Sequence, residues 1–105
     1  QALIMHIRGK GLVVLTGCGH AGVVNIVRYA KRLTGIDDVY AVIGGFHLGG
    51  QLEADVIPAT IAELKSLSPA VIVPAHCTGW RAVAQLAEAC PDALIRNSVG
   101  TRFDL

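Results

Sequence analysis

Residues 12–22 read LVVLTGCGHAG, an apolar run that ends in a glycine-rich turn carrying a histidine. The same arrangement recurs as VYAVIGGFH over residues 39–47 and as VIVPAH over residues 71–76. Each apolar run predicts a short buried strand, and helix-like sequence follows each turn. Because parallel strands end at one edge of a sheet, we expect the three histidines to emerge together at that edge. The expected strands are Leu12–Thr16, Val39–Ile43 and Val71–Val73.

Three helices are expected between and after these strands. Apolar side chains recur every three or four residues in Gly22–Leu33, which Gly35 ends, and in Pro58–Leu67, which its proline begins. A third helix is expected over Thr78–Cys90, with the threonine as its N-cap and Trp80 on its buried side. Strands alternating with helices are typical of an α/β layer.

Further strands are expected at both ends of the chain. Ala2–Ile7 is joined to the first apolar run by residues 8–11, RGKG, whose glycines allow a tight antiparallel hairpin. Ala93–Ser98 and Thr101–Leu105 are predicted as extended segments broken at Gly100. All 105 residues are therefore predicted as a single domain of the α/β class. Its order is ββαβαβαβ, with a mixed, mostly parallel sheet and about three helices.

The composition excludes several classes of partner. Hydrophobic residues make up 52% of the chain and the formal charge is +1, so there is no basic stripe for nucleic acid and no polybasic segment for a membrane surface. No apolar stretch approaches the roughly 20 residues that span a bilayer, and no signal peptide begins the chain. Three cysteines cannot all pair with one another, and two of them lie beside histidine turns. We therefore expect a soluble cytoplasmic protein with reduced thiols.

The glycine-rich turn supports two hypotheses. Gly17-x-Gly19-x-x-Gly22 follows a strand and opens a helix, which is the setting of a dinucleotide-binding motif. That motif also needs an acidic residue at the carboxyl end of the next strand, whereas Asp37 and Asp38 precede that strand. The dinucleotide-binding hypothesis is therefore the weaker of the two.

In the second hypothesis, the same turn gathers metal ligands. Cys18 and His20 lie two positions apart, and His76-Cys77 repeats the pairing of imidazole and thiol after the third strand. Neutral imidazole nitrogen and thiolate sulfur are both ordinary zinc ligands. A lone histidine is more often structural than a ligand, and His6 in the first strand is expected to be a structural or surface histidine. Three histidines at equivalent strand ends favour a metal site instead.

Three segments together resemble the carboxyl-terminal half of the metallo-β-lactamase fold: TGCGHAG at 16–22, GGFHL at 44–48 and PAHCTG at 74–79. More narrowly, they resemble the subgroup of metal-dependent hydrolase-like proteins that includes the dihydropterin–ribofuranosylaminobenzene phosphate synthases. The resemblance implies half of a four-layer αββα fold in which two sheets face each other. It also implies a site for one or two divalent metals, zinc above all, that activates water or binds a phosphate-bearing or ester substrate.

The resemblance also assigns roles to individual residues. His76 matches the family's last metal-ligand histidine, and His20 is the histidine that the subgroup presents at the first turn. We therefore expect His20 and His76 to be metal ligands, and no residue of this chain is assigned a catalytic role. Further metal-binding or substrate-binding residues are expected among His47, Cys18, Gly45, Cys77 and Thr78.

One motif of the family is missing from these residues. His-x-His-x-Asp-His belongs to the amino-terminal half of the fold, and no His-x-His occurs in the chain. The chain alone is therefore expected to be inactive, as the carboxyl-terminal portion of a metal-dependent hydrolase or phospho-substrate transferase. Its sheet would leave a large apolar face open, so we expect a homodimer or association with an amino-terminal half. The alternative is a noncatalytic binding or assembly module that pairs with a separate partner chain.

Overall fold

The computed structural model describes residues 1–50 and 53–105. Its elements are β1 (Ala2–Ile7), β2 (Gly11–Thr16), α1 (Val23–Thr34), β3 (Val39–Gly44), α2 (Glu53–Ser66), β4 (Val71–Pro74) and α3 (Trp80–Ala89). The four strands form one sheet in the order β1-β2-β3-β4, in which β1 is antiparallel to β2 and the other neighbours are parallel. The predicted α/β class, the mixed sheet and the three helices are confirmed.

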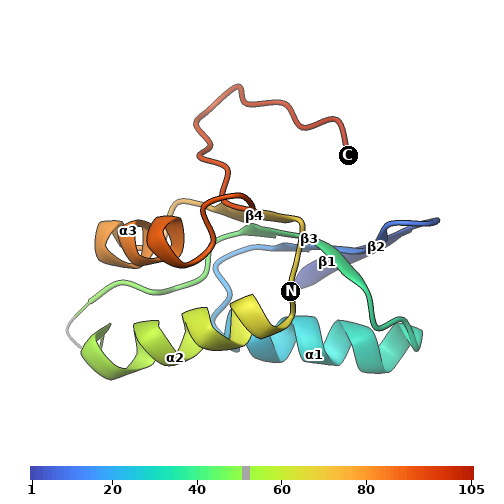
Figure 1. The fold of residues 1–105 in the computed structure, drawn as a ribbon, viewed down its shortest axis with the longest axis horizontal. Coiled ribbons are helices and arrows are strands. Elements are labelled where there is room, and N and C mark those ends of the chain that lie inside the picture. Colours follow the sequence, from blue (N-terminus) through green and yellow to red (C-terminus); the bar gives the residue numbers. More distant parts are fainter. Residues whose placement is uncertain (51–52) are drawn as a thin grey trace.

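Helices cover one face of the sheet (Figure 1). α1 and α2 run beneath the sheet, while α3 lies beside β4 and contributes to the same core. Side chains alternate along a strand, so Val14, Val42 and Ile72 all point to this helical layer, where they are fully buried. Such burial contributes about 25 cal/mol per Å2 of apolar surface, and it holds the two layers together.

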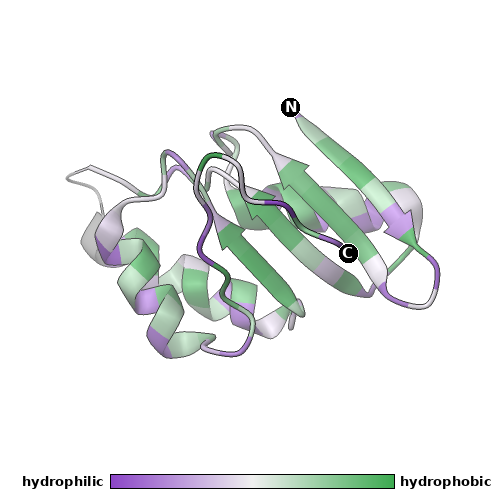
Figure 2. Cartoon of the chain, turned by 90° about the horizontal axis from the view of Figure 1, so that it is seen from above, coloured by the Kyte–Doolittle hydropathy of each residue, from purple (hydrophilic) through white to green (hydrophobic). Residues whose placement is uncertain are grey.

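The other face of the sheet stays partly open along β1 and β2. Leu3, Met5 and Leu15 lie on this face and are 55%, 40% and 40% exposed, although Val13 among them is fully buried. The C-terminal segment arches over the same face (Figures 1 and 2). Figure 2 shows that the strands seen from this side are strongly hydrophobic. An open apolar face is therefore present, but it is confined to one side of the sheet.

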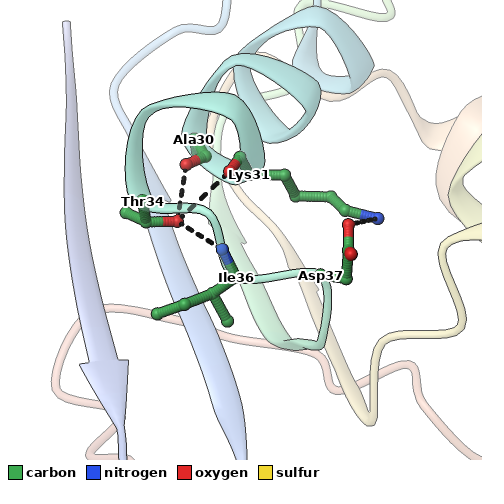
Figure 3. A network of polar contacts seen from close by, with 5 residues as sticks. All are labelled: Ala30, Lys31, Thr34, Ile36 and Asp37. Atoms are coloured by element: carbon green, nitrogen blue, oxygen red, sulfur yellow. Dashed lines mark hydrogen bonds and ion pairs between the residues drawn. The ribbon is translucent and has the colours of Figure 1, made fainter.

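The end of α1 lies within one residue of its predicted position. Gly35 adopts a left-handed conformation with φ of 70°, and its N–H donates to the Lys31 carbonyl at 2.8 Å. The Thr34 hydroxyl donates to a carbonyl of the preceding turn at 2.8 Å and accepts from the Ile36 N–H at 3.3 Å (Figure 3). With the ion pair between Lys31 and Asp37, these contacts fix the turn that leads into β3.

The second helix begins earlier than predicted. α2 starts at Glu53, so Pro58 lies inside the helix rather than at its first position. A proline lacks an N–H and costs the helix one hydrogen bond, which is tolerated here because Pro58 is exposed. Ile57 and Leu64 are buried against the core, and this packing maintains the helix on both sides of the proline. No helix among the described residues has the length and apolarity needed to cross a bilayer.

Two predictions about the third helix are wrong. α3 begins at Trp80 with Gly79 as its N-cap, and the Thr78 hydroxyl instead accepts a hydrogen bond from a backbone N–H after β3 at 3.1 Å. Trp80 is 76% exposed rather than buried. Ala82 and Leu86 turn their common face to the core, and Trp80 lies about 200° around the helix from Ala82.

The predicted strands after α3 are also wrong. Within residues 91–105, which the structure describes in full, Leu94 forms an isolated bridge to Ile72 of β4. The Ile72 N–H donates to the Ala93 carbonyl at 2.7 Å, and the Ile95 N–H donates to the Ile72 carbonyl at 2.9 Å. Strand pairing stops there because residues 95–102 are all exposed, so a longer strand would have no buried face to stabilise it.

At one point β2 and β3 approach so closely that only glycine fits. Gly44 pairs with Thr16 and has φ of 129°. A Cβ at Gly44 would clash with the Thr16 carbonyl oxygen. The absence of a side chain therefore lets the carboxyl ends of the two strands meet, and the turns that follow them lie side by side.

Candidate metal centre

The carboxyl ends of β2, β3 and β4 meet at one edge of the sheet, as predicted. The Gly45 N–H donates to the Gly17 carbonyl at 2.7 Å, and the Ala75 N–H donates to the Gly44 carbonyl at 2.8 Å. These hydrogen bonds continue the parallel pairing past the ends of β2 and β3. The three turns that carry the histidines are therefore fixed next to one another.

Three donor atoms gather where the turns after β2 and β4 meet. Cys18 Sγ lies 3.0 Å from His76 Nε2, and the Cys77 thiol donates to the Cys18 carbonyl at 3.3 Å. The two sulfurs and a ring nitrogen of His76 all lie within 4.8 Å of one another. The cysteines are half-buried and His76 is exposed. Among the side chains that the structure describes, no other three of these types lie close enough together to hold one metal ion.

The surroundings of Cys18 favour its protonated thiol over the thiolate. Burial raises the pKa of Cys18 above its usual value, and the neighbouring Cys77 raises it further through charge repulsion and a hydrogen bond. A thiol must lose its proton before it can bind a metal. Metal binding at this group therefore releases a proton from Cys18.

Gly45 forms the floor of the group. A Cβ at this position would clash with Cys77 Sγ and would lie 2.7 Å from the Gly17 oxygen and 2.9 Å from His76 Cε1. The turn after β3 therefore needs a residue without a side chain, so that His76 and Cys77 can lie against it. Gly45 shapes the group without offering a side-chain donor.

Thr78 connects the turn after β4 to the turn after β3. Its hydroxyl accepts a hydrogen bond from the Phe46 N–H at 3.1 Å, and the next residue, Gly79, donates its N–H to the Leu48 carbonyl at 2.9 Å. Phe46 and Leu48 are both buried, so these bonds anchor the turns in the core. The structure therefore places Thr78 beside the donor group as a link between backbone segments.

His20 and His47 form a second group. Their ring centroids lie 4.4 Å apart with the rings inclined by 62°, and both side chains are exposed. They line a pocket of about 440 Å3 whose wall includes the ion pair between Arg28 and Glu63. His47 has φ of 51°, a conformation that is uncommon outside glycine and is enriched at functional sites. The two expected ligands, His20 and His76, thus lie in different groups.

A larger groove adjoins both groups. It has a volume of about 920 Å3, and its lining includes Ile4 of β1, Tyr29 of α1, Cys18 and His20. Thr16 also lies in its wall, and the Thr16 hydroxyl is buried with no hydrogen-bond partner among the described residues. A molecule that reaches the donor group through this groove would therefore pass mostly apolar side chains.

Some of these residues could not be recognised in the sequence. Arg28 and Glu63 lie on different helices, and no spacing pattern relates them. Thr16 does carry a signal, because it is the polar residue that closes an otherwise apolar strand directly before the glycine turn. His6 lies in β1 with an exposed side chain, outside both groups, as expected for a surface histidine.

The donor group has the chemistry that zinc requires. In a tetrahedral site with zinc–sulfur and zinc–nitrogen distances of about 2.3 and 2.0 Å, the donor atoms lie about 3.5 to 3.8 Å apart. In this structure, Cys18 Sγ lies 3.0 Å from His76 Nε2, and no two of the three donor atoms lie more than 4.8 Å apart. The spacing in a tetrahedral zinc site falls between these two distances. Two thiols and an imidazole also have the softness that suits zinc. Three protein donors would leave the fourth position of a tetrahedral site open.

A solved structure shares this fold over the whole chain. The chain superposes on Tm1679, a metal-dependent hydrolase of the β-lactamase superfamily, with a TM-score of 0.90 and 30% sequence identity. The superposition covers 100% of this chain and 40% of Tm1679. The chain belongs to the metallo-β-lactamase superfamily. The resemblance inferred from the three histidine turns is confirmed.

Sequence relatives agree with this metallo-β-lactamase assignment. The chain is 47% identical over 93 residues to the 7,8-dihydropterin-6-methyl-4-(β-D-ribofuranosyl)-aminobenzene-5′-phosphate synthase of Methanocaldococcus jannaschii, a match that covers 87% of this chain and 31% of the synthase. It is 36% identical over 84 residues to the uncharacterized protein MJ0448 of the same organism, a match that covers 80% of this chain and 30% of MJ0448. No family model matches the chain. The chain spans about a third of the length of these curated relatives.

The metallo-β-lactamase assignment also favours metal ligands over dinucleotide binding at the glycine-rich turn. A dinucleotide site needs an acidic side chain at the carboxyl end of β3. That end carries Gly44 and Gly45, while Asp37 and Asp38 precede β3 at its opposite end.

Proposed function

We propose that this chain is the carboxyl-terminal part of a metal-dependent hydrolase or phospho-substrate transferase, and that it supplies one wall of a zinc site. The observation that carries the proposal is the group formed by Cys18, His76 and Cys77, whose donor atoms lie within 4.8 Å of one another. Similarity to a metal-dependent hydrolase and to a phosphate synthase supports these two reaction classes. The 105 residues lack His-x-His-x-Asp-His, so we expect them to be inactive without the rest of such a domain.

Each group of residues has its own task in this proposal. When bound, zinc would supply Lewis acidity and lower the pKa of coordinated water. His76 would hold it through Nε2, and Cys18 and Cys77 would hold it through deprotonated sulfurs. His47 and the Arg28 guanidinium line the smaller pocket, where they would bind the phosphate or ester group of a substrate. The apolar groove beside Cys18 would receive the remainder of that molecule.

We also place the protein in the cytoplasm. Its three cysteines are free, and two of them belong to the proposed zinc site, which requires thiols that are not oxidised. A reducing compartment would preserve those thiols.

Zinc titration of the purified chain tests the assignment of ligands. Wild type is expected to bind one equivalent of zinc. His76→Ala, Cys18→Ala and Cys77→Ala are each expected to weaken zinc affinity by about 100-fold or more, because each removes a ligand. Cys90→Ala is the matched control, since Cys90 is also half-buried but caps α3 outside the group, and its zinc affinity should stay that of wild type. Cobalt substitution should show the charge-transfer absorption of thiolate ligands.

The His20→Ala variant separates the two possible ligand sets. If the metal is held by the group that contains Cys18 and Cys77, His20→Ala leaves zinc affinity unchanged. If the sequence-based pair of His20 and His76 holds it, His20→Ala weakens binding as much as His76→Ala, and the cysteine variants do not. A wild-type chain that takes up no zinc would refute the proposed metal site altogether.

The open face of the sheet favours a role in assembly. Leu3 and Met5 of β1 and Leu15 of β2 expose an apolar strip on this face. We propose that a second copy covers this strip in the isolated 105-residue chain, where the rest of a metallo-β-lactamase domain is missing. A twofold homodimer is the simplest arrangement, because the same apolar face then buries itself on both copies.

Sedimentation velocity at micromolar concentration is expected to show this dimer. Met5→Glu should shift the chain to monomer, because it places a charge within the buried strip. Leu33→Glu is the control: Leu33 is 60% exposed, but it lies on α1 at the opposite face of the sheet, so the dimer should persist. A folded wild-type monomer at this concentration would disprove the association.

A further inference from the structure

Cys18 and Cys77 are brought together from distant parts of the chain. They are 59 positions apart in sequence and lie on the turns after β2 and β4. The Cys77 thiol donates to the Cys18 carbonyl at 3.3 Å, and the two sulfurs lie within 4.8 Å of each other. Cys90 lies outside this group, at the end of α3. The fold therefore pairs two of the three thiols and leaves the third apart.

The geometry permits a covalent bond with little movement. A disulfide needs a sulfur–sulfur distance of about 2.05 Å. Rotation of one cysteine by a single rotamer step about χ1 moves its sulfur by about 3 Å, which is enough to close a gap of at most 4.8 Å. Cys18 is flanked by Gly17 and Gly19, so its backbone can adjust to the bond. No atom lies within 4 Å of where a Cβ on Gly17 would be, so there is free space beside the turn.

We propose that Cys18 and Cys77 form a reversible disulfide when the metal-free chain meets hydrogen peroxide, and that this bond disables the metal site. The pairing of the thiols stands on their geometry, whereas its effect on zinc rests on the proposed function. A disulfide sulfur is not a thiolate ligand, so oxidation would leave His76 as the sole donor of its group. The two cysteines would thus hold zinc when reduced and release it when oxidised.

The reaction balances with hydrogen peroxide as the two-electron oxidant. One thiol loses its proton and its thiolate sulfur attacks a peroxide oxygen; the O–O bond breaks, the leaving hydroxide takes up a proton, and a sulfenic acid and one water form. The second sulfur attacks the sulfenic sulfur, the S–O bond breaks, and the S–S bond forms with release of a second water. Overall, two thiols are oxidised, one peroxide is reduced, and one disulfide and two waters result. Dithiothreitol reverses the bond by thiol–disulfide exchange.

Peptide mapping of the metal-free 105-residue chain after treatment with a slight excess of hydrogen peroxide tests this inference. The expected product is one intrachain cross-link between Cys18 and Cys77, abolished by dithiothreitol, while Cys90 remains fully open to alkylation. Cys90→Ser should give the same cross-link. Cys18→Ser and Cys77→Ser should give none, and circular dichroism would establish that they are folded. Differential alkylation of wild type provides the same information without any variant, because Cys18 and Cys77 should become protected in equal amounts.

The same oxidation experiment carried out with zinc distinguishes this inference from the proposed function. Preloading with one equivalent of zinc is expected to slow the cross-link by about tenfold or more, and the oxidised chain should bind zinc about 100-fold more weakly. A cross-link that forms equally fast with and without zinc would refute the metal site and leave the disulfide standing. Zinc binding without this cross-link, oxidation that stops at sulfinic acid, or cross-links through Cys90 would overturn the disulfide and leave the proposed function standing.

Discussion

Replacing Gly44 by alanine is expected to unfold the protein or to destabilise it by about 3 kcal/mol or more. Gly44 has φ of 129°, which residues with a side chain rarely adopt, and the new Cβ would clash with the Thr16 carbonyl oxygen. The obstacle is backbone, so rotation of a side chain cannot relieve it. Relief requires β2 and β3 to separate where their parallel pairing ends. Urea denaturation followed by circular dichroism would measure the lost free energy of unfolding.

Gly9→Ala is the matched control for this experiment. Gly9 also has a positive φ, at 79°, but no atom lies within 4 Å of the position that its Cβ would take. The free energy of unfolding is therefore expected to fall by only about 1 kcal/mol, which is the cost of holding an alanine in the left-handed backbone conformation. Equal destabilisation by the two substitutions would contradict our account, since it would mean that the contact between Gly44 and Thr16 is unimportant.

Replacing Gly45 by alanine is expected to weaken zinc binding by about 100-fold or more. The added Cβ would clash with Cys77 Sγ and lie 2.9 Å from His76 Cε1. Both donor side chains would therefore have to move away from residue 45. The Cβ would also lie 2.7 Å from the Gly17 oxygen, so some loss of stability is expected as well. Zinc titration under conditions where circular dichroism shows a folded chain would separate the two effects.

Gly17→Ala tests whether this effect is specific. Gly17 is the residue before Cys18, yet a Cβ there would meet no atom within 4 Å, and its φ is not in the left-handed region. Zinc affinity should therefore remain that of wild type. If Gly45→Ala binds zinc as wild type does, or if both variants lose binding equally, the packing of the donor group against Gly45 is not what shapes the site.

The central strands and the first helix could be predicted because one physical signal decides each of them. β2, β3 and β4 are short apolar runs bounded by glycine or proline, and a strand buried in a parallel sheet has this composition. The glycine that ends α1 is needed for its left-handed conformation. Local sequence and tertiary packing agree at these points.

Other boundaries depend on packing that the sequence does not display. Pro58 is a usual first residue of a helix, but the burial of Ile57 extends α2 to its amino-terminal side. Trp80 is apolar, yet the helix turns the small Ala82 towards the core instead. The segment after Leu94 has strand-forming residues but no buried surface against which to place them.

The same limit applies to the candidate site. The βα alternation predicts which edge of the sheet carries the histidines, because that edge follows from topology. It does not predict which side chains touch, since that depends on the shape of each turn. Cys18 and His20 are two residues apart, yet one lies 3.0 Å from His76 and the other lies against His47. The left-handed Gly19 lies between them.

The donors of the proposed site come from two turns that are separated by 58 residues, and the strands that precede these turns, β2 and β4, are not neighbours but both pair with β3. No short piece of the chain contains all three donors, so a nascent or partly folded chain has no preformed chelate to offer. Contacts between such distant segments form late, because the entropy of closing the intervening loop must first be overcome. We therefore expect zinc to bind only after the sheet has folded. The metal would then stabilise the folded sheet and would not direct its formation.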